Sequence, residues 1–216
     1  MDGKTTEIYL IRHGESQANE KNVFIGHGDL DLTEKGKKQA ELTAEYLKAC
    51  HFDVIYSSDL LRAYHTAEAT AKKLGLPIVK DERLREIDAG EWDFKTFDDL
   101  EKEYQESYGV WLSNIGLSQP DGGESVANLQ KRVLGVLEEI AKKHVGQKVA
   151  VFTHATPIRC LQTYSENKTI EEMKDVAWAH NASVSKVRFE NGKFIPLAFS
   201  NDEFLGELRT ALPDNV

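Results

Sequence analysis

Short uninterrupted apolar runs alternate along the chain with longer segments in which apolar residues recur every three or four positions. The run over residues 8–11 has no polar alternation, which is typical of a strand buried on both faces of a parallel sheet. Similar runs predict further strands at residues 53–56, 78–79, 148–152, 183–189 and 194–200. The last two flank Asn191-Gly192, a dipeptide that favours a tight hairpin turn.

The segments between these runs have the periodicity of amphipathic helices. Thr33 is the expected N-cap of the first helix, and Ser58 or Asp59 is the expected N-cap of the helix that ends before Gly75. Pro157 suits the first turn of a later helix, where its missing N–H costs nothing. Besides the helix before Gly75, the periodicity predicts helices at about residues 34–48, 96–113, 124–144, 156–165 and 170–177.

This alternation predicts one α/β domain over residues 1–216, with three layers (α/β/α), a largely parallel central sheet and an antiparallel edge strand. Residues 87–123 contain several glycines and are expected to form a variable, cap-like segment. An aromatic stripe on the helix at 96–113 favours a core position. The alternative is that its outer edge, at Tyr108 or Trp111, contacts a leaving group.

Composition narrows the location and the partners of the protein. A hydrophobic fraction of 40% excludes global disorder, no apolar run is long enough to span a bilayer, and no secretory signal is visible. Cys50 and Cys160 lie far apart and suit a reducing compartment, so we expect a cytoplasmic protein. The 27 Lys and Arg against 36 Asp and Glu give a net charge of −9, which argues against nucleic acid or an anionic membrane as partner.

Two histidines and two arginines fall where predicted strands end. Arg12 and His13 follow the first strand, with Gly14 allowing a sharp turn, and His154 follows the strand at 148–152. Arg62 stands in the first turn of the helix after the second strand. Ligands of open α/β sheets bind beyond the carboxyl ends of the strands, and the planar fork of arginine matches phosphate oxygens. A small phosphorylated ligand is therefore expected at this edge.

Five ordered blocks of sequence resemble the histidine phosphatase superfamily, the phosphoglycerate mutase-like family. Residues 10–15 followed by Asn19 resemble its signature, and the blocks at residues 26–36, 57–67, 84–92 and 122–133 follow in the same order. Two departures are visible. Asp31 replaces a usual proline, and Ala155-Thr156-Pro157 follows the second histidine where the family usually has two glycines.

The resemblance implies a phosphoglycerate mutase-like fold and a phosphomonoesterase that acts through a phosphohistidine. His13 would be the nucleophile, Arg12, Arg62 and His154 would bind the phosphoryl oxygens, and Glu86 would be the general acid and base. Neighbouring carboxylates are alternatives for the acid: Glu82, Asp88, Glu91 and Asp93. Further contacts to substrate or phosphate are expected from Ser16, Asn19, Gly26 and Ala155, although Ser16 and Asn19 equally suit a loop cap.

The leading hypothesis is hydrolysis of a small phosphorylated metabolite to release inorganic phosphate, by a monomer or homodimer. One alternative is a cofactor-dependent phosphoglycerate mutase, which the short, acidic stretch at 87–123 disfavours. The other is an inactive module that binds a phospho-ligand, which the intact set of candidate residues disfavours. The remaining histidines show no metal-ligand spacing, so we expect no metal and no cofactor. The sequence leaves the substrate open among sugar phosphates, nucleotides, phosphoglycerate and a cobamide precursor.

Overall fold

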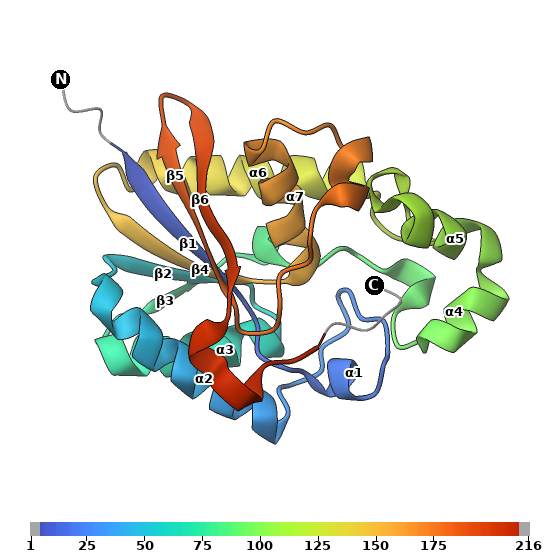
Figure 1. Ribbon diagram of the computed structural model, residues 1–216, viewed down its shortest axis with the longest axis horizontal. Helices are drawn as coiled ribbons and strands as arrows, with labels where there is room; N and C mark the ends of the chain where they lie inside the picture. The colour runs from blue at the N-terminus through green and yellow to red at the C-terminus, as the bar shows by residue number, and fades with distance from the viewer. Residues whose placement is uncertain (1–4, 212–216) are drawn as a thin grey trace.

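A six-stranded sheet with the order β3-β2-β4-β1-β5-β6 runs through the computed structural model, which describes residues 5–211 (Figure 1). Strands β3, β2, β4 and β1 are parallel, β5 is antiparallel to β1, and β6 is antiparallel to β5. The strands are β1 (Thr6–Arg12), β2 (Val54–Ser57), β3 (Ile78–Lys80), β4 (Lys148–Thr153), β5 (Val184–Glu190) and β6 (Lys193–Asn201). The predicted mixed sheet is confirmed. Residues 1–4, to which the prediction of no secretory signal applies, lie outside the described range.

Helices cover both faces of this sheet, as the three-layer prediction requires (Figure 1). Helices α2 and α3 pack on one face, and α6 and α7 pack on the other. The α-helices are α1 (Gln17–Glu20), α2 (Glu34–Leu47), α3 (Leu61–Leu74), α4 (Phe97–Glu103), α5 (Gln105–Asn114), α6 (Val126–Lys143) and α7 (Ala155–Ser165). Short 3₁₀ turns are η1 (Lys48–Cys50), η2 (Glu82–Leu84), η3 (Gly90–Trp92), η4 (Ile115–Leu117), η5 (Glu171–Asp175) and η6 (Glu203–Leu208).

The apolar run of β1 has no polar positions because both of its faces are buried. Ile8 and Leu10 pack into the core below α6 and α7, and Tyr9 and Ile11 pack into the core on the side of α2 and α3. All four side chains are buried. Complete burial of such side chains is worth about 1.5–3 kcal/mol each, so this central strand anchors the residues that follow it. No helix within residues 5–211 combines the length and apolarity needed to cross a bilayer.

Three local predictions are wrong, and each has a physical reason. The helix expected at 96–113 is broken at Tyr104, whose backbone (φ −126°, ψ 42°) separates α4 from α5. The helix expected at 170–177 is the short 3₁₀ turn η5. Neither Ser58 nor Asp59 is the N-cap of α3. Leu60 holds that position without a side-chain cap, and the carboxylate of Asp29 accepts the N–H of Leu61 at 2.8 Å.

Other local predictions are confirmed. The hydroxyl of Thr33 accepts the N–H of Gly36 at 3.0 Å and so caps α2. Pro157 lies in the first turn of α7. Asn191 and Gly192 both adopt positive φ angles, 52° and 77°, at the turn between β5 and β6. Short-range chemistry therefore predicted these turns and caps correctly.

Candidate active site

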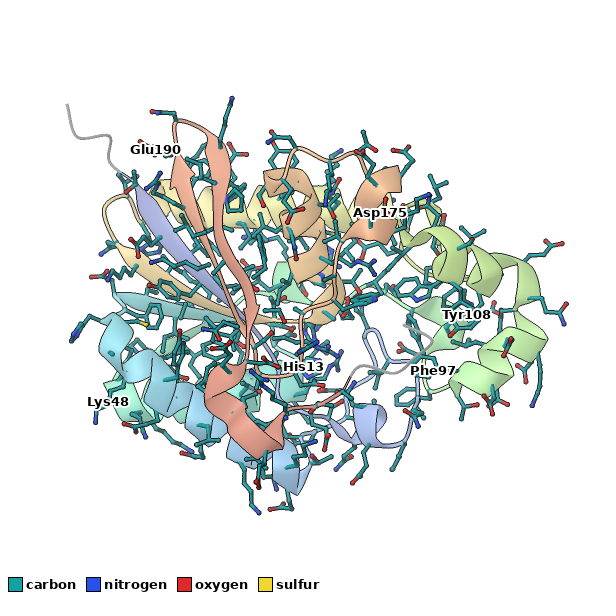
Figure 2. The ribbon with its side chains drawn as sticks, in the orientation of Figure 1. His13, Lys48, Phe97, Tyr108, Asp175 and Glu190 are labelled. Carbon is teal, nitrogen blue, oxygen red and sulfur yellow. The ribbon has the colours of Figure 1, made fainter. Side chains whose placement is uncertain are left out.

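A cavity of about 340 Å³ opens at the carboxyl ends of the central strands. Arg12 and His13, which end and follow β1, line it together with Arg62 from the first turn of α3. Glu86, from the loop after η2, and Ala155, at the start of α7, complete the polar end. Figure 2 shows His13 near the centre of the molecule, with Phe97 on the side of α4. The structure thus brings together residues more than 140 positions apart.

His13 is held in the form that a nucleophile needs. Its Nδ1 lies 2.7 Å from the carbonyl oxygen of Gly14, so Nδ1–H donates to that oxygen and Nε2 keeps its lone pair. Burial lowers the pKa of His13 well below its usual value, and the charges of Arg62 and Arg12 lower the pKa further. The ring is therefore neutral at pH 7.

Close backbone packing explains the glycine after His13. A Cβ on Gly14 would lie 2.6 Å from the carbonyl oxygen of Gly36, well inside contact distance. The N–H of Gly14 donates to the hydroxyl of Thr66 at 3.0 Å, and the N–H of His13 donates to the carbonyl of Thr153 at 3.0 Å. The loop that carries His13 is thus fixed against α2, α3 and β4.

Both arginines are buried and held by backbone carbonyls rather than by carboxylates. Arg12 Nη1 donates to the carbonyl of Ala179 at 2.6 Å. Arg62 donates through Nη1 to Gly28 at 3.0 Å and through Nη2 to Gly26 at 2.8 Å. Burial lowers the pKa of each guanidinium to about 10, so both stay charged at neutral pH. Within residues 5–211 neither Nε has a hydrogen-bond partner, which leaves donors for an anion.

The loop that holds Arg62 is itself held by Asp93. Its Oδ1 accepts the N–H of Gly26 at 2.6 Å, and its Oδ2 accepts the N–H of Gly28 at 3.1 Å. Gly26 was expected to contact substrate, but Asp93 takes its N–H, Arg62 takes its carbonyl, and it does not line the cavity. A Cβ there would lie 2.2 Å from the carbonyl oxygen of Ile87, so the position requires glycine. Gly26 shapes the site from outside it.

His154 lies beside His13, with their ring centroids 5.2 Å apart. Its Nε2 is 2.9 Å from the hydroxyl of Ser58, and its Nδ1 is buried without a partner in the described part of the chain. Burial lowers the pKa of His154 well below its usual value, with Arg62 contributing next. The sequence indicates only a possible helix-capping role for Ser58 and gives no sign of this contact, which joins residues 96 positions apart.

Of the five candidate carboxylates, Glu86 is the one that lines the cavity among the described residues. Its Oε1 accepts the N–H of Ile87 at 2.8 Å, and its Oε2 accepts the N–H of Thr156 at 3.2 Å. Asp88 instead accepts from Gly90, Glu91 lies near the hydroxyl of Tyr104, and Asp93 holds the loop described above. The two backbone donors fix the carboxyl group of Glu86 facing the same space as His13.

The loop after His13 both caps helix α1 and contributes a side chain to the cavity lining. Ser16 and Asn19 form a reciprocal capping box at the start of α1, and Ser16 is buried away from the cavity. Asn19 and Ala155 do line the cavity. The side-chain amide of Asn181 donates to Asn19 Oδ1 and to the carbonyl of His13, both at 3.2 Å. Asn181 also lines the cavity, and no signal in the sequence pointed to it.

The rest of the described cavity lining is mostly apolar, with Asn22 among its few polar members. Trp111 belongs to it, so of the two residues that the sequence offered for a leaving-group contact Trp111 is the one at the cavity, whereas Tyr108 belongs to the core and not to the cavity lining. The larger apolar side chains in this part of the lining are Val23, Phe24, Ile25, Ile87, Phe97, Trp111 and Trp178. Thr210 and Ala211 lie at the same cavity and come from the last described residues.

Residues 8–202 match the family model of the histidine phosphatase superfamily (branch 1). The chain belongs to the histidine phosphatase superfamily. This superfamily member is 36% identical over 202 residues to phosphoserine phosphatase 1 of Hydrogenobacter thermophilus, covering 93% of this chain and 95% of that protein. It is 33% identical to a metal-independent phosphoserine phosphatase of Arabidopsis thaliana, covering 96% of this chain and 87% of the relative. The solved structure of Bacillus stearothermophilus YhfR superposes with a TM-score of 0.89 at 29% identity, covering 93% and 99% of the two chains.

The resemblance seen in the sequence is therefore confirmed, and the fold is the phosphoglycerate mutase-like one. This histidine phosphatase is an enzyme that acts on phosphomonoesters. Its cavity brings together a neutral imidazole, two buried guanidiniums and one carboxyl group within a single lining.

Proposed function

We propose that the protein hydrolyses a small phosphomonoester in two steps through a phosphohistidine on His13. The observation that carries this proposal is the hydrogen bond from His13 Nδ1 to the carbonyl of Gly14, which leaves Nε2 free beside two guanidiniums. A neutral nitrogen with a free lone pair is a competent nucleophile for phosphorus, and fixed positive charge stabilises the equatorial oxygens of the transferring group.

In the first step Nε2 of His13 bonds to phosphorus while the bond from phosphorus to the leaving oxygen breaks. Glu86, in its protonated form, gives its proton to that oxygen. The phosphorylated imidazole carries positive charge, and the carbonyl of Gly14 stabilises it through the Nδ1–H donor. In the second step water bonds to phosphorus, the bond to Nε2 breaks, and Glu86 takes a proton from the water. Inorganic phosphate and neutral His13 result.

His154 is proposed to bind a phosphoryl oxygen through Nδ1, and Ser58 to set its tautomer. When the hydroxyl of Ser58 donates to Nε2 at 2.9 Å, the ring proton must lie on Nδ1. Nδ1 then becomes a buried donor that lacks a partner within residues 5–211, which is costly unless an acceptor arrives. A phosphoryl oxygen supplies that acceptor. The usual glycines after the second histidine are not needed for this contact.

Hydrolysis is favoured over phosphoglycerate mutase activity by the charges in the cavity. A mutase must hold a second anionic group, yet Arg12 and Arg62 are the cationic side chains in the described lining, and both face one phosphoryl group. The names of the phosphoserine phosphatase relatives support the same reaction. The proposal includes residues 87–123 as a cap, because Ile87, Phe97 and Trp111 line the cavity. We also propose that the protein is a cytoplasmic monomer or homodimer, that it needs no cofactor and that it binds no nucleic acid.

Trapping the intermediate tests this function. Brief mixing with a ³²P-labelled phosphomonoester should give an acid-labile, base-stable phosphoprotein, which is the stability of a phosphohistidine. His13→Ala should abolish the label and lower turnover by roughly 10³-fold or more. His65→Ala, at a position of α3 that bonds Asp31 and does not line the cavity, is the matched control and should keep both label and turnover. A His13→Ala protein with normal label would overturn the proposal.

A further inference from the structure

The cavity has two ends of opposite chemistry. Arg12, His13, Arg62 and Glu86 form the polar end, and aromatic and aliphatic side chains form the other. We propose that this apolar end receives the leaving group, so that the preferred substrates are phosphomonoesters of uncharged, apolar or aromatic alcohols. This inference rests on the proposed function, since it concerns the alcohol that is released when His13 takes the phosphoryl group.

The apolar wall is rigid because aromatic rings contact one another around it. The ring centroids of Phe24 and Trp111 are 5.1 Å apart, and those of Trp111 and Trp178 are 6.2 Å apart. Arg159 supports Trp178 with its guanidinium 4.2 Å from the ring centroid. Arg159 donates to the carbonyl of Met173 at 2.9 Å and does not line the cavity. Its charge is therefore not offered to a ligand, and the surface that faces the ligand is the aromatic face.

Charged partners for a charged leaving group are missing from the described lining of the cavity. Its cations are Arg12 and Arg62, which the phosphoryl group occupies, and its carboxylate is Glu86, which both backbone donors hold. No lysine belongs to the described lining. A leaving group that carries a carboxylate or an ammonium would lose its hydration here without gaining an opposite charge, which is strongly unfavourable.

Two of the uncharged polar side chains in the lining, Asn181 and Thr210, are bonded within the protein. Asn181 donates to His13 and to Asn19, so its amide hydrogens are used within the site. The hydroxyl of Thr210 accepts from Gln39 Nε2 at 2.8 Å, and the same Nε2 donates to the carbonyl of Leu208 at 2.7 Å. Gln39 thereby holds the segment of residues 208–210 beside the cavity. The polar groups that remain in the described lining, such as Asn22 and Thr156, are uncharged and cannot form an ion pair with a carboxylate or an ammonium.

Substrates with matched leaving groups test the inference without confusing it with reactivity. We would compare kcat/KM for 2-phenylethyl phosphate, phosphoethanolamine and O-phospho-L-serine, all of which release a primary alcohol. Burial of the phenyl group predicts about 10- to 100-fold higher kcat/KM for 2-phenylethyl phosphate. Equal or higher kcat/KM for phosphoserine would overturn the inference but leave the phosphatase intact. If the protein hydrolysed none of these three substrates and no p-nitrophenyl phosphate either, the proposed function itself would be overturned.

A charge added to the wall should reverse the preference. Phe97 is half-buried at the first position of α4, so Phe97→Arg places a cation at the apolar end with little disturbance of the core. We expect kcat/KM to rise about tenfold for phosphoserine and to fall about tenfold for 2-phenylethyl phosphate. Leu112→Arg, on an exposed position of α5, is the matched control and should change neither value. Phe97→Leu should keep the apolar preference. An unchanged ratio in Phe97→Arg would refute the assignment of this wall to the leaving group.

Discussion

Acid should destabilise the folded protein through His13 and His154, because folding buries both rings in their neutral form. Burial lowers both pKa values well below the usual one, and the neighbouring guanidiniums add to the effect. Above an unfolded-state pKa of about 6.5 neither state binds the proton, so the contribution of each ring is fully present. As the pH falls below about 6.5, the unfolded chain binds protons at these histidines and the folded protein does not, so the folded state becomes less stable relative to the unfolded state.

The size of this effect follows from proton linkage. If both rings stay neutral in the folded protein throughout this range, each ring should lower the free energy of unfolding by about 1.4 kcal/mol between pH 7.5 and 5.5, and the two together by about 3 kcal/mol. This window lies above the ordinary pKa values of carboxyl groups, about 3.9–4.3, so their titration contributes little. A loss of about 3 kcal/mol is a large part of the 5–15 kcal/mol that is typical of a folded domain.

Urea unfolding at pH 7.5, 6.5 and 5.5 in phosphate-free buffer measures this pH-dependent loss of stability. His154→Gln should remove about half of the pH-dependent loss, because glutamine keeps a polar group near Ser58 and does not titrate. Val136→Ala, on the buried face of α6, is the control and should lower stability equally at each pH. Saturating inorganic phosphate should flatten the wild-type dependence, because a bound anion favours protonated rings. If wild type and His154→Gln lose stability in parallel, the assignment of buried neutral histidines is refuted.

Four further predictions concern turnover and inhibition. Glu86→Gln should slow hydrolysis of alkyl phosphates about 10²- to 10⁴-fold but p-nitrophenyl phosphate far less; equal losses would assign the acid to another group. Ser58→Ala should lower kcat about tenfold with little change in KM, because His154 loses the partner that fixes its tautomer; steady-state kinetics with an unchanged kcat would contradict this. Asp93→Asn should weaken vanadate inhibition about tenfold, because the loop that orients Arg62 loses its carboxylate; an unchanged inhibition constant would argue against this linkage. Turnover should survive EDTA, and recovery by added Mg²⁺ after a loss would disprove a metal-independent site.

The sheet and the polar end of the cavity were predictable because both depend on short stretches of sequence. A buried parallel strand appears as an uninterrupted apolar run, and the residue after it must lie at the ligand-binding edge. This placed Arg12 and His13 in the cavity lining, and His154 beside His13 but outside that lining. Arg62 followed from its position in the first turn after β2. Prediction succeeded wherever one strand end fixed the location of one side chain.

The features that the sequence did not predict depend on contacts between distant segments, and a local pattern of residues carries no information about such contacts. The N-cap role at α3 passed to Asp29, 32 residues away from its partner. Asn181 and Trp178 reach the cavity from beyond residue 170, and their neighbours in sequence gave no hint of it. The break at Tyr104 separates two short helices that pack differently on the aromatic core, so an amphipathic stripe that looked continuous is divided between them.

The loop of residues 26–28, which bonds both Asp93 and Arg62, lowers the entropic cost of binding a substrate. A free arginine side chain loses roughly 2 kcal/mol of rotamer entropy when it is ordered around a ligand. Here Gly26 and Gly28 give their carbonyls to Arg62 and their N–H groups to one carboxylate, so the guanidinium is oriented before any ligand arrives. The ordering is completed once, during folding. Each substrate therefore meets a binding surface that needs no rearrangement, and each departing phosphate leaves it ready for the next.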